Sequence, residues 1–258
     1  MNNRVDFDPF QRFRQATRAR IGLGRSGDSL PTDALLEFQL SHARARDAVH
    51  GSVDFDAMAE RLAPLNIWRA RSKARDRADY LTRPDLGREL DPACVPEDLG
   101  APYDIAFVIA DGLSAAAVEN HAEAVLHACL KRLGDFNIAP IILASQARVA
   151  FGDHAAQASQ ASLVVVLIGE RPGLSVPDSL GAYVTWAPEK GRRDNERNCI
   201  SNIHADGLPY EAAASKIVWI IREAFKRRLT GVGLKEEAND EEIEQNKVQS
   251  GQGQILDR

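Results

Sequence analysis

Hydrophobic residues gather in short runs that alternate with helix-like stretches from about residue 100 onward. The runs at 105–110, 138–143 and 163–168 are bounded by polar or turn residues, as buried strands are. The stretches 115–133 and 154–161 instead carry hydrophobic residues or good helix formers at helical spacing. This alternation predicts an α/β fold with a Rossmann-like, mostly parallel sheet and helices on both faces.

The pattern continues towards the C-terminus with shorter elements. Residues 182–186 and 199–203 are candidates for two more short strands, and 211–229 has the apolar stripe of an amphipathic helix. Residues 234–258 are acidic and poor in hydrophobic residues, so we expect this tail to be disordered.

The first 95 residues read as helical. Pro31, Thr32 and Asp33 offer a helix start, good helix formers follow over 34–50, and Gly51 ends the run. A second helix is expected over 56–62. We therefore divide the chain into a helical N-terminal region that makes subunit contacts (1–95), a Rossmann-like domain (96–233) and the tail (234–258).

A third helical segment is expected over 70–79, where the chain is rich in arginine. Two interpretations of the positive charges here are open: a phosphate-binding face, or a solvated or subunit-facing surface. Alternating basic and acidic residues on a helix favour the second. The positive charges are those of Arg69, Arg71, Lys73, Arg75 and Arg77.

Composition narrows the class of protein. The 258 residues are 44% hydrophobic and 27% charged with a net charge of −5, which is ordinary for a soluble domain and gives no support to nucleic-acid binding. Three widely spaced cysteines fit neither a disulfide framework nor a zinc motif, and we expect no metal site. No stretch approaches the roughly 18 apolar residues of a membrane span. We expect a cytoplasmic protein.

Three loops at predicted strand ends are candidate ligand sites, because open α/β sheets bind ligands there. They are DGLS (111–114), RVAFGD (148–153), and GERPGL (169–174) together with NCISNIH (198–204). None of them matches the glycine-rich dinucleotide or triphosphate motifs.

Each loop also has a structural interpretation. Asp111 is expected to support its turn and Ser114 to cap a helix, while Asp153 is a candidate N-cap. Arg148 could hold an amide or a phosphate of a ligand. Glu170 and Arg171 must be paired locally or meet a ligand's polar rim.

The segment 198–204 would place Asn198, and with it Ser201 or Asn202, along a site wall. Cys199 and His204 are five residues apart in a strand-like run, so their side chains should lie on opposite faces. A thiol nucleophile is therefore disfavoured.

Five motifs in this order resemble a known family. ARIGLGR (19–25), YLTRPDLGR (80–88), DGLS, GERPGL and NCISNIH are together similar to the small (light) subunit of ethanolamine ammonia-lyase, over roughly residues 12–233. Each motif is weak alone, whereas their order is specific.

The resemblance implies a cofactor and a partner. In that family the large subunit, a TIM barrel, holds the substrate, and adenosylcobalamin lies between the subunits in a hexamer of large–small pairs, a hetero-dodecamer. The cobalamin contacts of the small subunit would fall on Val149, Glu170 and Cys199. The family reaction is a radical conversion of ethanolamine to acetaldehyde and ammonia, and we expect no catalytic acid or base on this chain.

Further expectations depend on this resemblance. The chain lacks D-x-H-x-x-G, the motif by which other cobalamin proteins replace the lower base, so we expect base-on cobalamin. Packaging in a bacterial microcompartment is left open, since the lead before the first motif is short. The alternative function is a stand-alone α/β protein that binds a nucleotide-like ligand, or a regulatory protein. A Cys199-dependent hydrolase is a weaker alternative.

Overall fold

The computed structural model describes residues 9–17, 19–100 and 102–234, and within them six strands form one sheet in the order β1-β3-β2-β4-β5-β6. Strands β1 to β4 are mutually parallel, whereas β5 and β6 run antiparallel to their neighbours. The predicted α/β fold with a mostly parallel sheet is thus confirmed. The strands are β1 (Ile67–Arg71), β2 (Tyr103–Ala110), β3 (Ile141–Ser145), β4 (Ala161–Gly169), β5 (Leu180–Trp186) and β6 (Arg197–Ile203).

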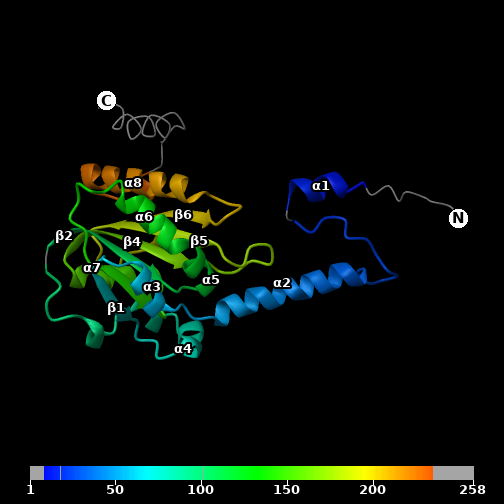
Figure 1. Cartoon of the computed structure of the whole chain (residues 1–258), viewed down its shortest axis with the longest axis horizontal. Coiled ribbons are helices and arrows are strands. Elements are labelled where there is room, and N and C mark those ends of the chain that lie inside the picture. The colour runs from blue at the N-terminus through cyan, green and yellow to red at the C-terminus, as the bar shows by residue number, and fades with distance from the viewer. Residues whose placement is uncertain (1–8, 18, 101, 235–258) are drawn as a thin grey trace, which may run out of the picture.

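Helices cover both faces of the sheet, as expected (Figure 1). One face packs against α3 (Phe55–Arg61), α6 (Glu123–Leu130) and α8 (Tyr210–Arg227), and the other against α7 (Phe151–Ala158). The predicted helix over 115–133 comprises α5 (Ala115–Ala117), a π-helical turn (Val118–Ala122) and α6. Single 3-10 turns occupy Leu86–Arg88, Pro92–Cys94, Asp194–Glu196 and Gly231–Gly233.

The expected helix over 70–79 is wrong. Its first residues belong to β1, an edge strand in which Trp68 and Ala70 are buried and alternate with exposed arginines. Helix α4 (Arg77–Thr82) begins only at Arg77. The two-residue period of burial was hidden because the arginines on the solvent side look like a charged helix face.

Most of the arginine-rich segment is surface, as expected. Arg69 pairs with Asp56 at 2.5 Å, Arg71 with Asp91 at 2.8 Å, and the remaining exposed cations have similar partners. Arg77 differs, because its guanidinium points inward to the backbone oxygen of Val49 at 2.6 Å.

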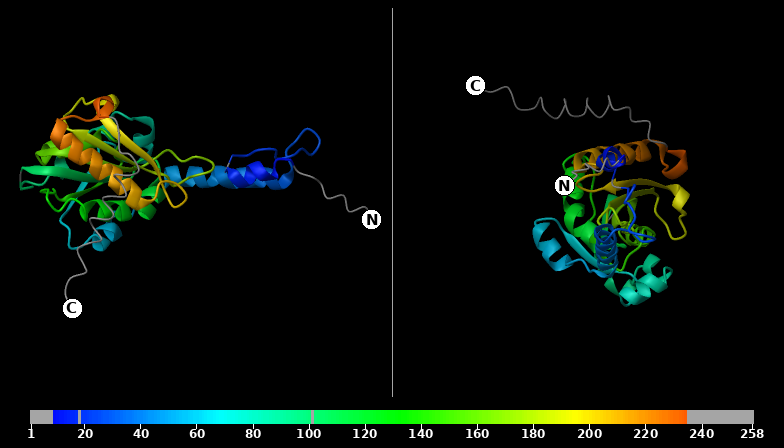
Figure 2. Two further views of the ribbon diagram at one scale, coloured as in Figure 1. Left: turned by 90° about the horizontal axis from the view of Figure 1, so that it is seen from above. Right: turned by 90° about the vertical axis from the view of Figure 1, so that its right-hand side faces the viewer.

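A long arm leaves the body of the molecule (Figures 1 and 2). It consists of α2 (Thr32–His50), whose C-terminal end joins the sheet domain, and of the segment containing α1 (Gln11–Ala16), which lies back along it. In the described part of the chain, α2 buries a single residue, Ala48. A 19-residue helix with so little burial is not explained by packing against the other described residues. No helix in the described residues is both long and apolar enough to cross a bilayer.

A buried ion pair ties α7 to the far edge of the sheet. The Arg197 guanidinium at the start of β6 donates to both carboxylate oxygens of Asp153 in α7, at 2.7 and 2.6 Å. Both side chains are 1% exposed. Arg197 also donates to the Thr185 hydroxyl of β5 at 2.9 Å. The pair therefore fixes α7 relative to β5 and β6.

We predict that Arg197→Met destabilises the fold by about 3–5 kcal/mol, because Asp153 is left buried without its partner. Urea denaturation measures this free energy of unfolding. Arg83→Met is the matched control: Arg83 pairs with Asp85 where both side chains are more than half exposed. It should leave the denaturation midpoint close to that of the wild type, and equal losses in the two variants would contradict the role assigned to the buried pair.

Candidate functional site

The three residues expected to contact a ligand, Val149, Glu170 and Cys199, lie on the α7 side of the sheet. Register places Val166 of β4 opposite Tyr183 of β5, and Tyr183 opposite Cys199 of β6. Val149 and Tyr183 both pack against the core that α7 covers. Residues that are 50 positions apart in sequence thus share one surface.

Close approach of α7 to the sheet shapes this surface. A Cβ atom on Gly152 would overlap Val166 Cγ2, so only glycine lets α7 lie this low over β4. The described helices leave the neighbouring part of the face open, since Cys199 and Ser201 of β6 are exposed. The result is an open face on β5 and β6 beside the start of α7.

Glu170 is held at the end of this face by a cradle. The Ser179 hydroxyl donates to Glu170 Oε2 at 2.5 Å, and the Glu170 backbone N–H donates to the Ser179 carbonyl at 2.9 Å. The side chain lies over Gly181 of β5, where a Cβ would stand 2.9 Å from Oε1. Among the described residues Oε1 has no hydrogen-bond partner. One carboxylate oxygen is therefore fixed and the other is available as an acceptor.

Cys199 lies directly opposite Tyr183 in the β5–β6 ladder, so the two side chains are neighbours on one face. Desolvation raises the pKa of the Cys199 thiol, and the negative charge of Glu170 acts in the same direction, while the interaction with Tyr183 acts against them. A thiol with a raised pKa is a poor nucleophile at neutral pH. The site favours a contact role for Cys199, not hydrolase chemistry.

Val149 precedes α7 and borders a cleft of about 660 Å³. The cleft also contains Arg148, His154 and the turn around Lys190, but neither Glu170 nor Cys199. The structure therefore groups Glu170 with Cys199 directly, and it places Val149 on the same face across the start of α7.

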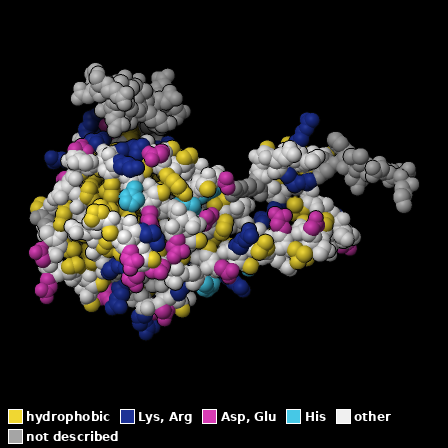
Figure 3. Space-filling view, in the orientation of Figure 1, with side chains coloured by type: hydrophobic (Ala, Val, Ile, Leu, Met, Phe, Trp, Pro, Cys, Tyr) yellow, Lys and Arg dark blue, Asp and Glu magenta, His cyan; other side chains and the backbone are white. Residues whose placement is uncertain are grey.

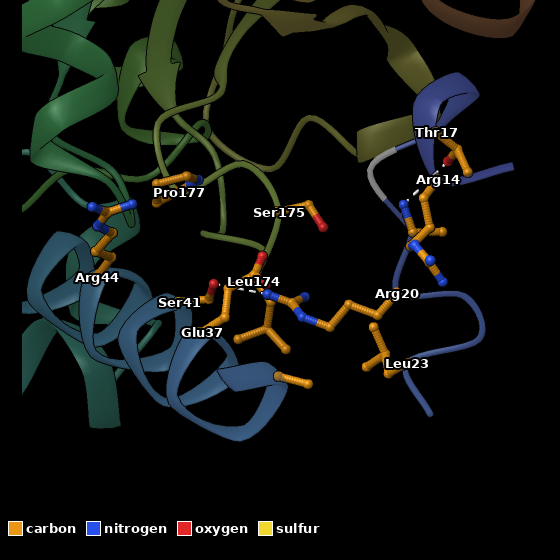
Figure 4. Close-up of a pocket in the computed structure, with 12 residues that line it drawn as sticks. Arg14, Thr17, Arg20, Leu23, Glu37, Ser41, Arg44, Leu174, Ser175 and Pro177 are labelled. Carbon is orange, nitrogen blue, oxygen red and sulfur yellow. Dashed lines mark hydrogen bonds between the residues drawn. The ribbon is translucent and has the colours of Figure 1, made fainter. Parts of the chain in front are cut away.

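The loop that follows Glu170 is anchored at its far end. The Ser114 hydroxyl donates to the Pro177 carbonyl at 2.9 Å, and Asp178 lies 3.4 Å from the buried ring of His121 in the π-helical turn. Leu174 and Pro177, from the same loop, face the arm across a cleft of about 390 Å³ (Figure 4). One loop thus touches both the candidate site and the arm.

The first strand-end loop serves the fold itself. The Asp111 carboxylate accepts backbone N–H groups of Gln146 at 2.8 Å and Ala147 at 3.1 Å, and burial raises its pKa to about 6. Ser114 caps the following helix by accepting from Ala117 N at 3.2 Å. The structural interpretation of this loop is confirmed, and the side chains of Asp111 and Ser114 are already bonded within the fold.

Other expectations for single residues need correction. Asp153 is not an N-cap, because α7 begins at Phe151 and Asp153 is inside the helix as the partner of Arg197. Arg148 points inward, donating to the Tyr80 carbonyl at 2.8 Å and stacking on the Tyr80 ring.

Asn198 does not line the open face either. Its amide bonds to the Leu234 carbonyl and to the Gly231 N–H, each at 2.7 Å. His204 bonds to Asn202 at 2.9 Å, and no contact in the described residues joins it to Cys199, as its spacing predicted. Arg171 is exposed and has no side-chain partner within those residues.

Sequence reasoning missed Tyr183, Gly181 and Ser179. Part of this could have been read from the sequence. In the predicted strand over 182–186, period-two alternation puts Tyr183 and Thr185 on one face, and Gly181, just before the strand, continues that face. Which face receives the ligand could not be told from alternation. In the described residues there is no group of three or more His, Cys, Asp or Glu side chains arranged to hold a metal ion.

Fold and site together define an α/β protein with an open face on β5 and β6, at the edge of the sheet where we expect the ligand. Comparison with known proteins specifies the family. Residues 7–235 match the family of the ethanolamine ammonia-lyase light chain (EutC), and the chain belongs to that family. It is thus a subunit of a lyase.

Curated relatives agree with this assignment. The chain is 54% identical over 232 residues to the ethanolamine ammonia-lyase small subunit of Rhodopseudomonas palustris, covering 87% of this chain and 89% of that one. The small subunits of Bradyrhizobium diazoefficiens and Azotobacter vinelandii are 52% and 50% identical. They cover 88% and 90% of this chain, and 90% and 89% of their own lengths.

We predict that Gly181→Ala destabilises the protein by about 1–2 kcal/mol, because the new methyl group displaces Glu170 and breaks its bond to Ser179. Thermal or urea unfolding checks this. Gly134→Ala is the control, since a Cβ there would meet nothing within 4 Å. If Gly181→Ala is as stable as this control, the cradle around Glu170 is not rigid.

Proposed function

We propose that this chain forms one side of an adenosylcobalamin site in an ethanolamine ammonia-lyase that converts ethanolamine to acetaldehyde and ammonia. Val149, Glu170 and Cys199 are its cofactor contacts. The main support for the proposal is the position of Glu170. Its carboxylate is held in place, one of its oxygens has no hydrogen-bond partner in the described residues, and it lies at the edge of an open face that also presents Cys199.

The residues present suit a corrinoid. A corrin offers a broad apolar ring rimmed by amide groups, which need apolar contact and hydrogen-bond acceptors. Val149 supplies an aliphatic surface, Glu170 Oε1 an acceptor, and Cys199 a small side chain that lets a large ring approach β6. The open face is a strand ladder, which offers adjacent side chains of β5 and β6 to one side of a broad ligand.

When bound, the cofactor supplies the radical chemistry of the reaction. The residues of this chain bind and orient it, and exclude water from one side. No side chain on the face is placed here as a catalytic acid or base. Since the sequence lacks D-x-H-x-x-G, we propose that the cofactor keeps its own lower base.

The partner proposed is the large subunit, a TIM barrel, in a cytoplasmic hetero-dodecamer of large–small pairs. The relatives' name, small subunit, implies a larger partner. The arm fits such a role, because several of its hydrophobic side chains are exposed among charged ones (Figure 3). Those residues are Phe13, Leu35, Leu36, Phe38 and Leu40.

The alternative of a stand-alone protein for a nucleotide-like ligand is not favoured. Its proposed ligand groups at Asp111 and Ser114 are used in internal hydrogen bonds. Co-expression with a large subunit tests the main proposal: acetaldehyde release should require both chains and cobalamin. Release that does not depend on this chain would refute it.

Glu170→Ala is predicted to weaken cobalamin binding about 10- to 100-fold, the loss of one hydrogen bond to a charged group. Glu170→Gln keeps an acceptor and should lose less. Equilibrium dialysis of the co-expressed complex with cyanocobalamin measures the affinity, and the KM for ethanolamine is the internal comparison. Equal losses in cofactor and substrate affinity would mean that Glu170 is misplaced in this account.

Leu36→Asp with Leu40→Asp is predicted to prevent co-purification with the large subunit while leaving the unfolding midpoint of this chain unchanged. Both leucines are more than half exposed, so the charges cost little in the isolated chain. Val232→Asp is the control, because Val232 is 72% exposed and lies outside the arm. Normal co-purification of the double variant would contradict the assignment of the arm to the partner.

A further inference from the structure

We infer that Tyr183 is a fourth contact residue of the ligand face, offering its ring to the bound macrocycle between Glu170 and Cys199. This inference rests on the proposed function and extends it to a residue that the family motifs do not contain. The first observation is the position of Tyr183. It is the β5 residue directly opposite Cys199, on the face that also holds Val149.

The ring lies where the other contacts meet. Tyr183 Cε2 is 3.3 Å from the position of a Cβ on Gly181, and the same position is 3.2 Å from Glu170 Cγ. The absent side chain of Gly181 thus brings Glu170 and the edge of the Tyr183 ring together. The ring packs on the α7-side core with one part and is half-buried, which leaves the other part for a ligand.

The hydroxyl group has a separate role, because Tyr183 lies directly opposite Cys199 in the ladder and its interaction with the thiol lowers the pKa of Cys199. The pairing places both side chains next to each other on the same face of the sheet. Burial raises the pKa of Tyr183 well above its ordinary value, so the phenol stays protonated at neutral pH. Tyr183 therefore serves as an apolar surface and as the positioning residue for Cys199.

The test uses the co-expressed complex of both full-length chains with cyanocobalamin as the probe. Tyr183→Ala should weaken its affinity about tenfold, the equivalent of one lost aromatic contact. Tyr103→Ala is the matched control: it truncates a tyrosine that packs on the same core but lies opposite Ala161, at the other end of β4. The control should stay within about twofold of the wild type. Wild-type affinity in Tyr183→Ala would overturn the inference.

A second variant covers the case in which Tyr183→Ala does not fold. Tyr183→Phe keeps the ring and removes the hydroxyl group, whose interaction with the thiol lowers the pKa of Cys199. Alkylation of the Cys199 peptide, followed by mass spectrometry, should then show its pH midpoint moved upward, with cyanocobalamin affinity nearly unchanged. An unmoved midpoint would overturn the positioning role.

The same measurements separate the two proposals. If cyanocobalamin protects Cys199 in the wild-type complex but the Tyr183 variants behave normally, only the Tyr183 inference fails. If cyanocobalamin does not protect Cys199 from alkylation, and its affinity does not change in Glu170→Ala, the ligand does not bind at this face. The proposed function then fails as well.

Discussion

The buried contact between Asp153 and Arg197 is the constraint on which the ligand face depends. Strand β6 is the last strand of the sheet, and α7 lies over β4 and β2, two positions away. Beyond the packing of this helix on the sheet, a direct side-chain link joins it to that edge. The ion pair, with Thr185 as a third member, supplies the link, and Gly152 allows the helix to lie close enough for it to form. A charged pair in this position is costly to desolvate, so its value here is geometric, since it fixes where the open face begins.

The other residues of the candidate site lie along β5, starting from Thr185. Tyr183 lies two residues before Thr185 in β5, on the same face of the sheet. Gly181 lies two residues before Tyr183 and makes room for the side chain of Glu170. The loop after Glu170 then reaches the arm, where it lines a cleft with residues of α2. One short, anchored segment therefore connects Glu170 with the arm, the two places where we propose ligand contact and partner contact.

Much of the sheet could be predicted from sequence because its strands are continuous hydrophobic runs between turns. Strand β4 and helix α8 are examples, and both were located within a few residues. Strand β1 was missed because its exposed arginines imitate a helix surface. At the site, the hydrophobic pattern identified the loop at Glu170 as a candidate ligand loop, whereas the identity of the proposed ligand was inferred from the family resemblance alone. The pairing of Asp153 with Arg197 and the place of Tyr183 beside Cys199 depend on register and on helix position, which pattern does not specify.

The central claim is that this chain presents Val149, Glu170 and Cys199 together to a corrinoid held against its partner subunit. The most direct test is an experimental structure of the co-expressed complex with cyanocobalamin bound. We expect corrin density in contact with all three side chains, with an amide group of the ring hydrogen-bonded to Glu170 Oε1. Density for the corrin that lies wholly within the partner subunit, away from β5 and β6, would contradict it.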